Sequence, residues 1–158
     1  MLSGILVRAA TPRDAGLLAE MRVRSAAERH EHSSAAELED LMAASARMFA
    51  AKLEDRTLRA WIAFDGERAV GSACLMLLPA LPRIGQALPL DGRVRNVYVD
   101  PEYRRRGIAL AIMREALAEA ERERVDRLVL GTSDQGRALY ESLGFTTKED
   151  EMIFGSEE

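Results

Sequence analysis

The sequence predicts an α/β (α+β) fold in which helices flank a single mixed, mostly antiparallel β-sheet. Two β-rich runs, 58–64 and 69–78, flank the turn Asp65-Gly66-Glu67-Arg68, which is typical of a hairpin. Stretches with apolar residues at helical spacing precede this hairpin, and strands alternate with helices after it. The predicted order is β-α-α-β-β-β-α-β-α-β-β, which one sheet covered by helices accommodates.

The N-terminal helices are predicted from the residues that start them. After a short strand at Ile5-Leu6-Val7, Thr11 is expected to be the N-cap of a helix. Pro12 suits the first helical position, and Asp14 lies in the first turn. The apolar pattern of this helix ends before Ser34, and Ser34 is expected to be the N-cap of a second helix. The second helix carries apolar residues at roughly 3.6-residue spacing: Leu38, Leu41, Met42, Met48, Phe49 and Leu53.

The second half of the chain begins with a proline- and glycine-rich stretch, Pro79 to Gly92, which we expect to form a surface loop. The expected strands cover 94–99, 127–131, 145–148 and 152–154, and the expected helices cover 108–124 and 135–143. The first of these helices has an inward face of Leu110, Met113, Leu117 and Ala120, and an outward face of Glu115, Glu119 and Arg122.

Length and composition describe one soluble, globular domain that covers residues 1–158. Hydrophobic residues make up 47% of the chain and charged residues 30%, which excludes a disordered protein. The net charge of −4 argues against a nucleic-acid partner, because proteins that bind nucleic acids are more often basic.

No segment is suited to export or to a membrane. The first residues lack the charged start and the apolar stretch of a secretory signal. The longest nearly apolar run, Ala73 to Leu81, contains a proline and is too short to span a bilayer. The one cysteine, Cys74, excludes an internal disulfide and leaves no Cys/His set for zinc. We therefore expect a cytoplasmic protein without a metal.

Arg104, Arg105 and Arg106 stand where a helix is predicted to begin. Their placement opposes ordinary stability rules, because a helix N-terminus carries unpaired N–H groups and about half a positive charge. A bound anion removes the conflict, and Gly107 with the small Ala109 lets the backbone approach a phosphate closely. The alternative is a solvated basic surface with an incidental glycine. The segment matches neither a Walker A loop nor a dinucleotide-binding fingerprint.

The residues around these arginines resemble the acyl-coenzyme-A signature of the GNAT (GCN5-related) N-acetyltransferase superfamily. That signature, Arg/Gln-x-x-Gly-x-Gly/Ala, is matched by Arg104, Gly107 and Ala109. A second segment, Ser133 to Phe145, is similar to a later family helix that ends in Tyr-Glu-x-x-Gly-Phe. The resemblance covers nearly the full chain. It implies the GNAT fold and acetyl-CoA as the co-substrate of an N-acetyltransferase.

The resemblance also implies how the coenzyme would be held. In such enzymes the strand before the turn splays from its neighbour, so that the backbone of Val97 and Val99 pairs with the pantetheine arm. The Val97 N–H would act as an oxyanion hole, where one hydrogen bond contributes roughly 3–4 kcal/mol to the transition state. The amides of 105–109 would hold the pyrophosphate. The residues expected at the coenzyme are Val97, Val99, Arg104, Arg105, Arg106, Gly107, Ile108, Ala109, Ser133 and Tyr140.

Tyr140 matches the family tyrosine that lies near the coenzyme sulfur. A phenol in that position can protonate the leaving thiolate. The alternative is an aromatic side chain that only packs at the end of a helix. Ser133 departs from the family pattern, because many relatives have asparagine there to bond the coenzyme arm, and a hydroxyl has a shorter reach.

The general base is not identified by the sequence. Glu28, His30, Glu31 and His32 cluster where the first two helices meet, a region that lines the acceptor side in similar folds. A histidine can deprotonate an ammonium group near neutral pH, but a solvated helix end explains the same residues more simply. Asn96 is a further polar candidate. Cys74 is expected to be a core residue.

Two other functions compete with the transferase. One is a coenzyme-binding sensor or interaction module without turnover, and the other is a nucleic-acid contact made by the arginines. The amine acceptor stays open, whether a small molecule or a peptide, although the Glu28–Ser34 junction and the 79–92 loop are expected to select it. A homodimer is possible through an exposed terminal strand at 152–154.

Overall fold

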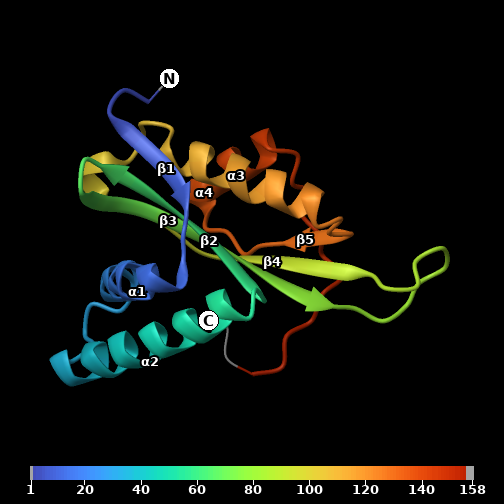
Figure 1. Ribbon diagram of the computed structural model, residues 1–158, viewed down its shortest axis with the longest axis horizontal. Coiled ribbons are helices and arrows are strands. Elements are labelled where there is room, and N and C mark those ends of the chain that lie inside the picture. Colours follow the sequence, from blue (N-terminus) through green and yellow to red (C-terminus); the bar gives the residue numbers. More distant parts are fainter. Residues whose placement is uncertain (1, 156–158) are drawn as a thin grey trace.

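The computed structural model describes residues 2–155 and contains one five-stranded sheet (Figure 1). Its strands are β1 (Ile5–Ala9), β2 (Leu58–Asp65), β3 (Arg68–Pro79), β4 (Leu90–Val99) and β5 (Arg127–Val129). They lie in the order β1-β2-β3-β4-β5. β1 to β4 pair antiparallel, and β5 pairs parallel with β4. The predicted mixed, mostly antiparallel sheet is therefore confirmed.

Within residues 2–155, four α-helices cover the sheet from both sides (Figure 1). They are α1 (Ala15–Arg29), α2 (Ala35–Glu54), α3 (Ile108–Arg122) and α4 (Asp134–Ser142), and the short 3-10 helices are η1 (Pro12–Asp14) and η2 (Pro101–Tyr103). Residues of α1 and α2 pack in one core cluster, and residues of α3 and α4 pack in the other. β2 serves both clusters, since Trp61 and Ala63 join the α3 side while Ala60 and Ile62 join the α1–α2 side. This double burial explains its nearly continuous apolar sequence.

The predicted helix starts agree closely with the structure. The Ser34 hydroxyl accepts a hydrogen bond from the Glu37 N–H at 3.1 Å, and the Ser34 N–H donates to the Glu37 carboxylate at 2.7 Å. This reciprocal pair is a capping box, and it sets the first turn of α2. At Thr11 a 3-10 turn comes first, and α1 itself begins at Ala15.

Asp14 ties the start of α1 to the first strand. Its carboxylate accepts hydrogen bonds from the Arg8 guanidinium at 2.8 and 2.9 Å and from the Thr11 N–H at 2.8 Å. These contacts with Arg8, together with the Thr11 N–H, hold the pKa of Asp14 at about 2. The Asp14 side chain is only 10% exposed, so solvent screens the interaction weakly.

Replacing Asp14 by asparagine is expected to lower the free energy of unfolding by about 2 kcal/mol at pH 7. Because the folded-state pKa is depressed, this stabilisation is present above the unfolded pKa of 3.8 and is lost as the pH falls toward 2. Urea unfolding at pH 7 and at pH 2.5 measures the difference between variant and wild type, which should shrink at the lower pH. The exposed Asp40, mutated to asparagine, provides the control.

The two terminal strands predicted at 145–148 and 152–154 are wrong. Neither segment forms a strand within the described residues, and the side chains of 152–154 are largely exposed. β5 offers an edge of only three residues, and the four charged residues Lys148–Glu151 interrupt the apolar pattern with types that are depleted in strands. The segment instead carries an exposed ion pair between Arg127 and Glu151 at 2.9 Å. The strand expected at a dimer edge is therefore not formed.

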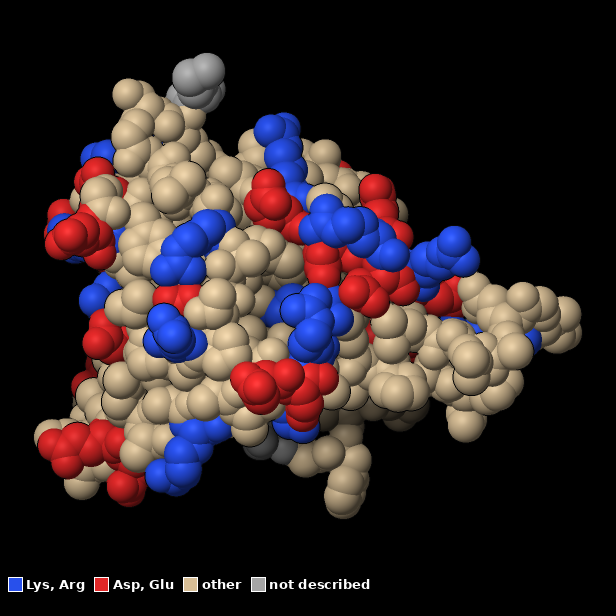
Figure 2. Space-filling view, in the orientation of Figure 1, with Lys and Arg blue, Asp and Glu red and all other residues tan. Residues whose placement is uncertain are grey.

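The predicted loop at 79–92 is shorter than expected, because β4 already begins at Leu90. Gly92 lies inside the strand. A Cβ atom at Gly92 would stand 2.8 Å from the Leu128 side chain and 3.1 Å from the Leu75 side chain. The glycine thus marks a close approach of β4 to the apolar side chains around it rather than a turn. The connection that remains projects from the molecule as an apolar tip at the right of Figure 2, with Leu81, Ile84 and Leu88 exposed.

The outward face predicted for α3 is wrong at Glu119. Its side chain is 13% exposed and pairs with Arg59 of β2, which is equally buried, and with Arg122 at 2.6 Å. The helix is rotated relative to the predicted face. Its buried residues are Ile108, Ile112, Met113, Ala116 and Ala120. Leu110 and Leu117 are half-buried.

Candidate active site

A β-bulge interrupts β4 in its second half. The register shifts between the partners of Ser72 and Cys74 on β3, so that Asn96 and Val97 lie together opposite Ala73. Asn96 has a φ of 56°, which is uncommon for a residue other than glycine. Both polar atoms of its side chain are buried without a hydrogen-bond partner among the described residues. Bulges and strained backbone of this kind concentrate at functional sites.

β4 and β5 pair only over a short distance. The parallel ladder joins Asp91–Arg93 to β5 and ends there, while β4 continues to Val99. The Asp100 N–H donates to the Val70 carbonyl on β3 at 2.8 Å. Because backbone groups alternate between the two edges of an antiparallel strand, Val99 directs its N–H and C=O to the opposite edge. Beyond Arg93 this edge of β4 therefore has no ladder to β5, as the family resemblance implied.

The turn between β4 and α3 has a left-handed backbone at two positions. Arg105 has a φ of 62°, and Gly107, the N-cap of α3, has a φ of 80°. A Cβ atom at Gly107 would meet only a Leu2 side-chain atom at 3.9 Å, so the conformation and not space requires glycine there. The N–H groups at the start of a helix attract anions, and left-handed residues in a turn help to form such a concavity.

The three arginines of this turn have different partners. Arg104 donates from Nε to the Val99 carbonyl at 2.9 Å and from Nη2 to the Glu28 carboxylate at 2.7 Å. The Arg106 guanidinium lies 5.0 Å from the centre of the Tyr103 ring, a cation–π contact. Among residues 2–155, Arg105 has no hydrogen bond, ion pair or ring contact. Arg105 is therefore the arginine that is available to an anion.

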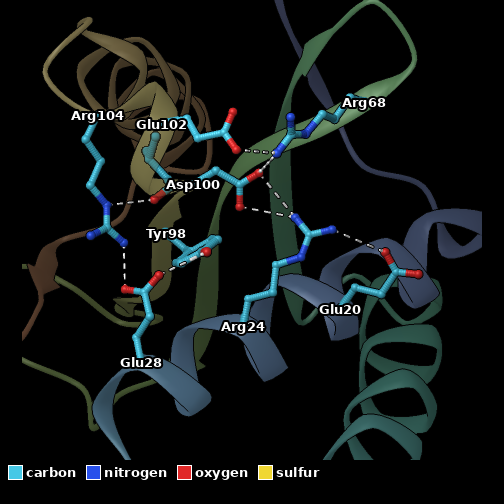
Figure 3. Close-up of polar contacts among 9 residues, drawn as sticks. Glu20, Arg24, Glu28, Arg68, Tyr98, Asp100, Glu102 and Arg104 are labelled. Carbon is cyan, nitrogen blue, oxygen red and sulfur yellow. Dashed lines mark hydrogen bonds and ion pairs between the residues drawn. The ribbon is translucent and has the colours of Figure 1, made fainter. Parts of the chain in front are cut away.

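Asp100 is a buried carboxylate beside this turn, with 4% of its surface exposed. Arg24 of α1 donates to it at 3.2 Å, and Arg68 of β3 donates at 3.3 Å and also pairs with Glu102 at 3.5 Å (Figure 3). A buried charge needs such partners, since removing one partner of a buried pair is costly. The network fixes α1, β3 and the end of β4 against one another.

Glu28 forms a second connection between α1 and β4. Besides Arg104, its carboxylate accepts a hydrogen bond from the Tyr98 hydroxyl at 3.2 Å (Figure 3). Burial raises the pKa of the Tyr98 phenol, and the carboxylates of Asp100 and Glu28 add to this effect. Tyr98 thus stays protonated and keeps donating to Glu28.

A hollow of about 530 Å³ lies where α1 meets α2. It is lined by Glu28, Arg29, His30, Glu31, His32, Ser33 and Glu37. The four residues that the sequence offers as candidates for the general base therefore line one hollow: Glu28, His30, Glu31 and His32. Glu28 belongs both to this hollow and to the connection with Arg104, which no local sequence signal indicated.

Tyr140 is buried on α4, with 8% of its surface exposed. Its ring packs edge-on against Phe145, with centroids 5.9 Å apart. Burial raises the pKa of the phenol, so the proton stays on the oxygen at neutral pH. Gly136 makes room for the ring, because a Cβ atom there would lie 3.1 Å from Tyr140. Ser133 is the N-cap residue of α4, but its side chain makes no capping hydrogen bond.

The Acetyltransferase (GNAT) family matches residues 20–145, and the chain therefore belongs to this family. The resemblance predicted from the two motifs is confirmed. A solved structure supports the fold: a predicted acetyltransferase with acetyl-CoA from Clostridium acetobutylicum has a TM-score of 0.82, at 23% identity, over 96% of both chains.

Two curated relatives share sequence with part of the chain. It is 34% identical over 85 residues to the glucosamine 6-phosphate N-acetyltransferase of Trypanosoma brucei brucei, over 54% of this chain and 56% of that protein. It is 35% identical over 82 residues to the N-alpha-acetyltransferase RimI of Mycobacterium tuberculosis, over 52% and 51% respectively. The alignments thus span about half the length of each relative.

Proposed function

We propose that this chain is an acetyl-CoA-dependent N-acetyltransferase, which transfers an acetyl group directly to a primary amine. The observation that carries the proposal is the edge of β4. The pairing with β5 ends after Arg93, a bulge follows at Asn96 and Val97, and a left-handed turn follows at Arg105. Family membership and a structural neighbour with acetyl-CoA support this donor.

In the proposed complex the backbone of Val97 and Val99 pairs with the pantetheine arm along the free edge of β4, which is the edge beyond Arg93 without a ladder to β5. The Val99 carbonyl, which also accepts the Arg104 hydrogen bond, would use its second lone pair, and the Val99 N–H would donate. The amides from 105 to 109, with the Arg105 guanidinium, hold the pyrophosphate at the start of α3. Arg106 and Arg104 lie beside them, although both side chains already have protein partners. Ser133 would reach the coenzyme arm from the start of α4.

The proposed reaction needs a neutral amine, so the ammonium form of the acceptor first loses one proton to solvent. The amine nitrogen bonds to the thioester carbon, and the carbon–sulfur bond breaks. The Val97 N–H stabilises the negative charge that forms on the carbonyl oxygen. Tyr140 gives its phenolic proton to the leaving thiolate and regains one from the protonated amide product. The products are the N-acetylated amine and coenzyme A with a free thiol, and no covalent acyl-enzyme forms.

The acceptor is proposed to be a small-molecule or peptide amine that enters beside the Glu28–Ser34 junction. The relatives are a glucosamine 6-phosphate N-acetyltransferase and an N-alpha-acetyltransferase, so an amino sugar phosphate and α-amines both belong in a test panel. Thiol release from acetyl-CoA, measured with and without each amine, tests the proposal. Release that depends on an amine supports a transferase, whereas binding of acetyl-CoA without release favours a coenzyme sensor.

Direct transfer predicts that Cys74 carries no acetyl group. Cys74 is 1% exposed, and burial raises the pKa of its thiol to about 12, so no thiolate forms near neutral pH. A Cys74→Ala variant is expected to keep the wild-type kcat. Intact-mass measurement of the wild-type protein with acetyl-CoA alone should find no acetyl adduct. An adduct that disappears in the variant would contradict direct transfer.

We also propose that residues 1–158 act as one domain in the cytoplasm, without nucleic acid or membrane as a partner. No helix between residues 2 and 155 is long and apolar enough to cross a membrane. On the face in Figure 2 the basic side chains lie in separate groups among acidic ones, which does not favour a nucleic-acid surface. A homodimer stays a hypothesis for sedimentation measurements.

A further inference from the structure

We propose that Arg104 and Glu28 are positioning residues. They hold the end of α1, with the hollow between α1 and α2, against the turn between β4 and α3 that would bind the coenzyme. The inference rests on the proposed function and deepens it. It assigns the first arginine of the turn to the acceptor side of the site, and it leaves phosphate binding to Arg105 and the backbone amides.

The Arg104 side chain is held at two points. Its Nε donates to the Val99 carbonyl at 2.9 Å, and its Nη2 donates to the Glu28 carboxylate at 2.7 Å. The guanidinium also lies 5.9 Å from the centre of the Tyr98 ring. A planar guanidinium with fixed donor directions suits such a bridge. If Arg104 turned to a phosphate, it would leave the Val99 carbonyl and the Glu28 carboxylate with fewer partners.

Glu28 lies in the last turn of α1, directly before the residues that form the hollow. Its two carboxylate oxygens have separate partners, since Oε2 bonds Arg104 and Oε1 bonds the Tyr98 hydroxyl (Figure 3). Both partners belong to the segment of β4 and its turn that would hold the coenzyme. The position of the hollow therefore depends on that segment.

The ion pair between Arg24 of α1 and Asp100 differs in kind from the Arg104–Glu28 pair. Arg24, one helical turn earlier, pairs with Asp100, which is buried and is also held by Arg68. That pair fixes α1 to the core of the network. The Arg104–Glu28 pair is more exposed, with side chains 45% and 39% accessible, and it acts on the edge beside Val99. The Arg104–Glu28 pair, together with the hydrogen bond from the Tyr98 hydroxyl to Glu28, therefore links β4 and its turn to the hollow.

Arg105 offers a natural comparison within the same turn. It has no protein partner among the described residues, so its charge is uncompensated. A ligand phosphate would therefore gain more from Arg105 than from Arg104, whose charge is already balanced by Glu28. The two neighbouring arginines are thus expected to differ in what their loss affects.

Hydrogen exchange measured by mass spectrometry, with free coenzyme A as the probe, tests the inference. In the wild-type protein coenzyme A should slow exchange at the turn and also at the end of α1. In Glu28→Gln and Arg104→Gln the turn should still be protected, but the added protection at α1 should disappear. The double variant should resemble each single one, because both remove the same interaction.

Affinity for coenzyme A, measured by calorimetry, separates the two arginines. We expect the dissociation constant of Arg104→Gln for coenzyme A to stay within about threefold of the wild-type value, because an exposed ion pair contributes little free energy. Arg105→Gln, the matched control, should bind about tenfold more weakly, as for a lost charge-assisted hydrogen bond. Equal losses for both variants, or unchanged protection of α1 in Glu28→Gln, would overturn the inference. Absence of protection at the turn in wild type would overturn the proposed function itself.

Discussion

Replacing Tyr140 by phenylalanine is expected to lower kcat about 100-fold, since general acids contribute on this order. The proposed role needs only the hydroxyl, and phenylalanine keeps the ring that packs against Phe145. The phenol is protonated at neutral pH, which is the state that a proton donor requires, and burial raises its pKa further. The dissociation constant for acetyl-CoA should not change, because the phenol acts on the leaving thiolate.

Steady-state kinetics with calorimetry for acetyl-CoA measure both quantities. Tyr103→Phe is the matched control, because it also removes one phenolic hydroxyl. That hydroxyl donates a hydrogen bond to Asp65 at 2.7 Å and is not proposed to contact the thioester. The control should keep the wild-type kcat. If Tyr140→Phe also keeps it while binding acetyl-CoA normally, the proton-donor role is wrong.

Reversing the charge at Arg105 is the second large effect that we expect. Arg105→Glu places a carboxylate beside the helix start that would receive the pyrophosphate, so it both removes an attraction and adds a repulsion. The dissociation constant for acetyl-CoA should rise about 100-fold, which corresponds to the loss of two charge-assisted interactions. Calorimetry measures this directly.

The phosphate-free thioester S-acetyl-pantetheine gives the sharpest control for this effect. It lacks the groups that Arg105 would bind, so wild type and Arg105→Glu should use it equally well. Arg47→Glu changes the net charge by the same amount from the exposed side of α2, and it should bind acetyl-CoA as wild type does. A parallel loss for S-acetyl-pantetheine would mean that the variant distorts the turn, which contradicts a phosphate contact.

Much of the fold follows from local sequence signals. The hairpin is specified by the turn at 65–68, and α2 is specified by Ser34 and Glu37, which form the predicted cap. These signals act over a few residues, so one sequence reveals them. The prediction of the terminal strands was wrong because strand pairing depends on a distant partner strand. Apolar residues at 152–154 match a strand pattern, but β5 provides too short an edge to pair with them.

The site was predictable where a motif marks it and unpredictable where contacts cross the fold. Gly107 and its neighbours stand out in the sequence because a cationic helix start is unfavourable. The left-handed backbone at Asn96 is invisible in the alternating pattern of β4. Arg104 and Glu28 are 76 positions apart, and their pairing requires α1 to lie on the end of β4. Only the assembled sheet shows that these two residues meet.

Product analysis after incubation with acetyl-CoA and a panel of amines tests the proposed N-acetyltransferase activity most directly. The panel includes glucosamine 6-phosphate and peptides with a free α-amino group, and Tyr140→Phe serves as the control. We predict that at least one amine becomes N-acetylated while an equal amount of coenzyme A is released, and that the variant does this far more slowly. Tight binding of acetyl-CoA without N-acetylation of any amine would contradict the proposed transferase activity.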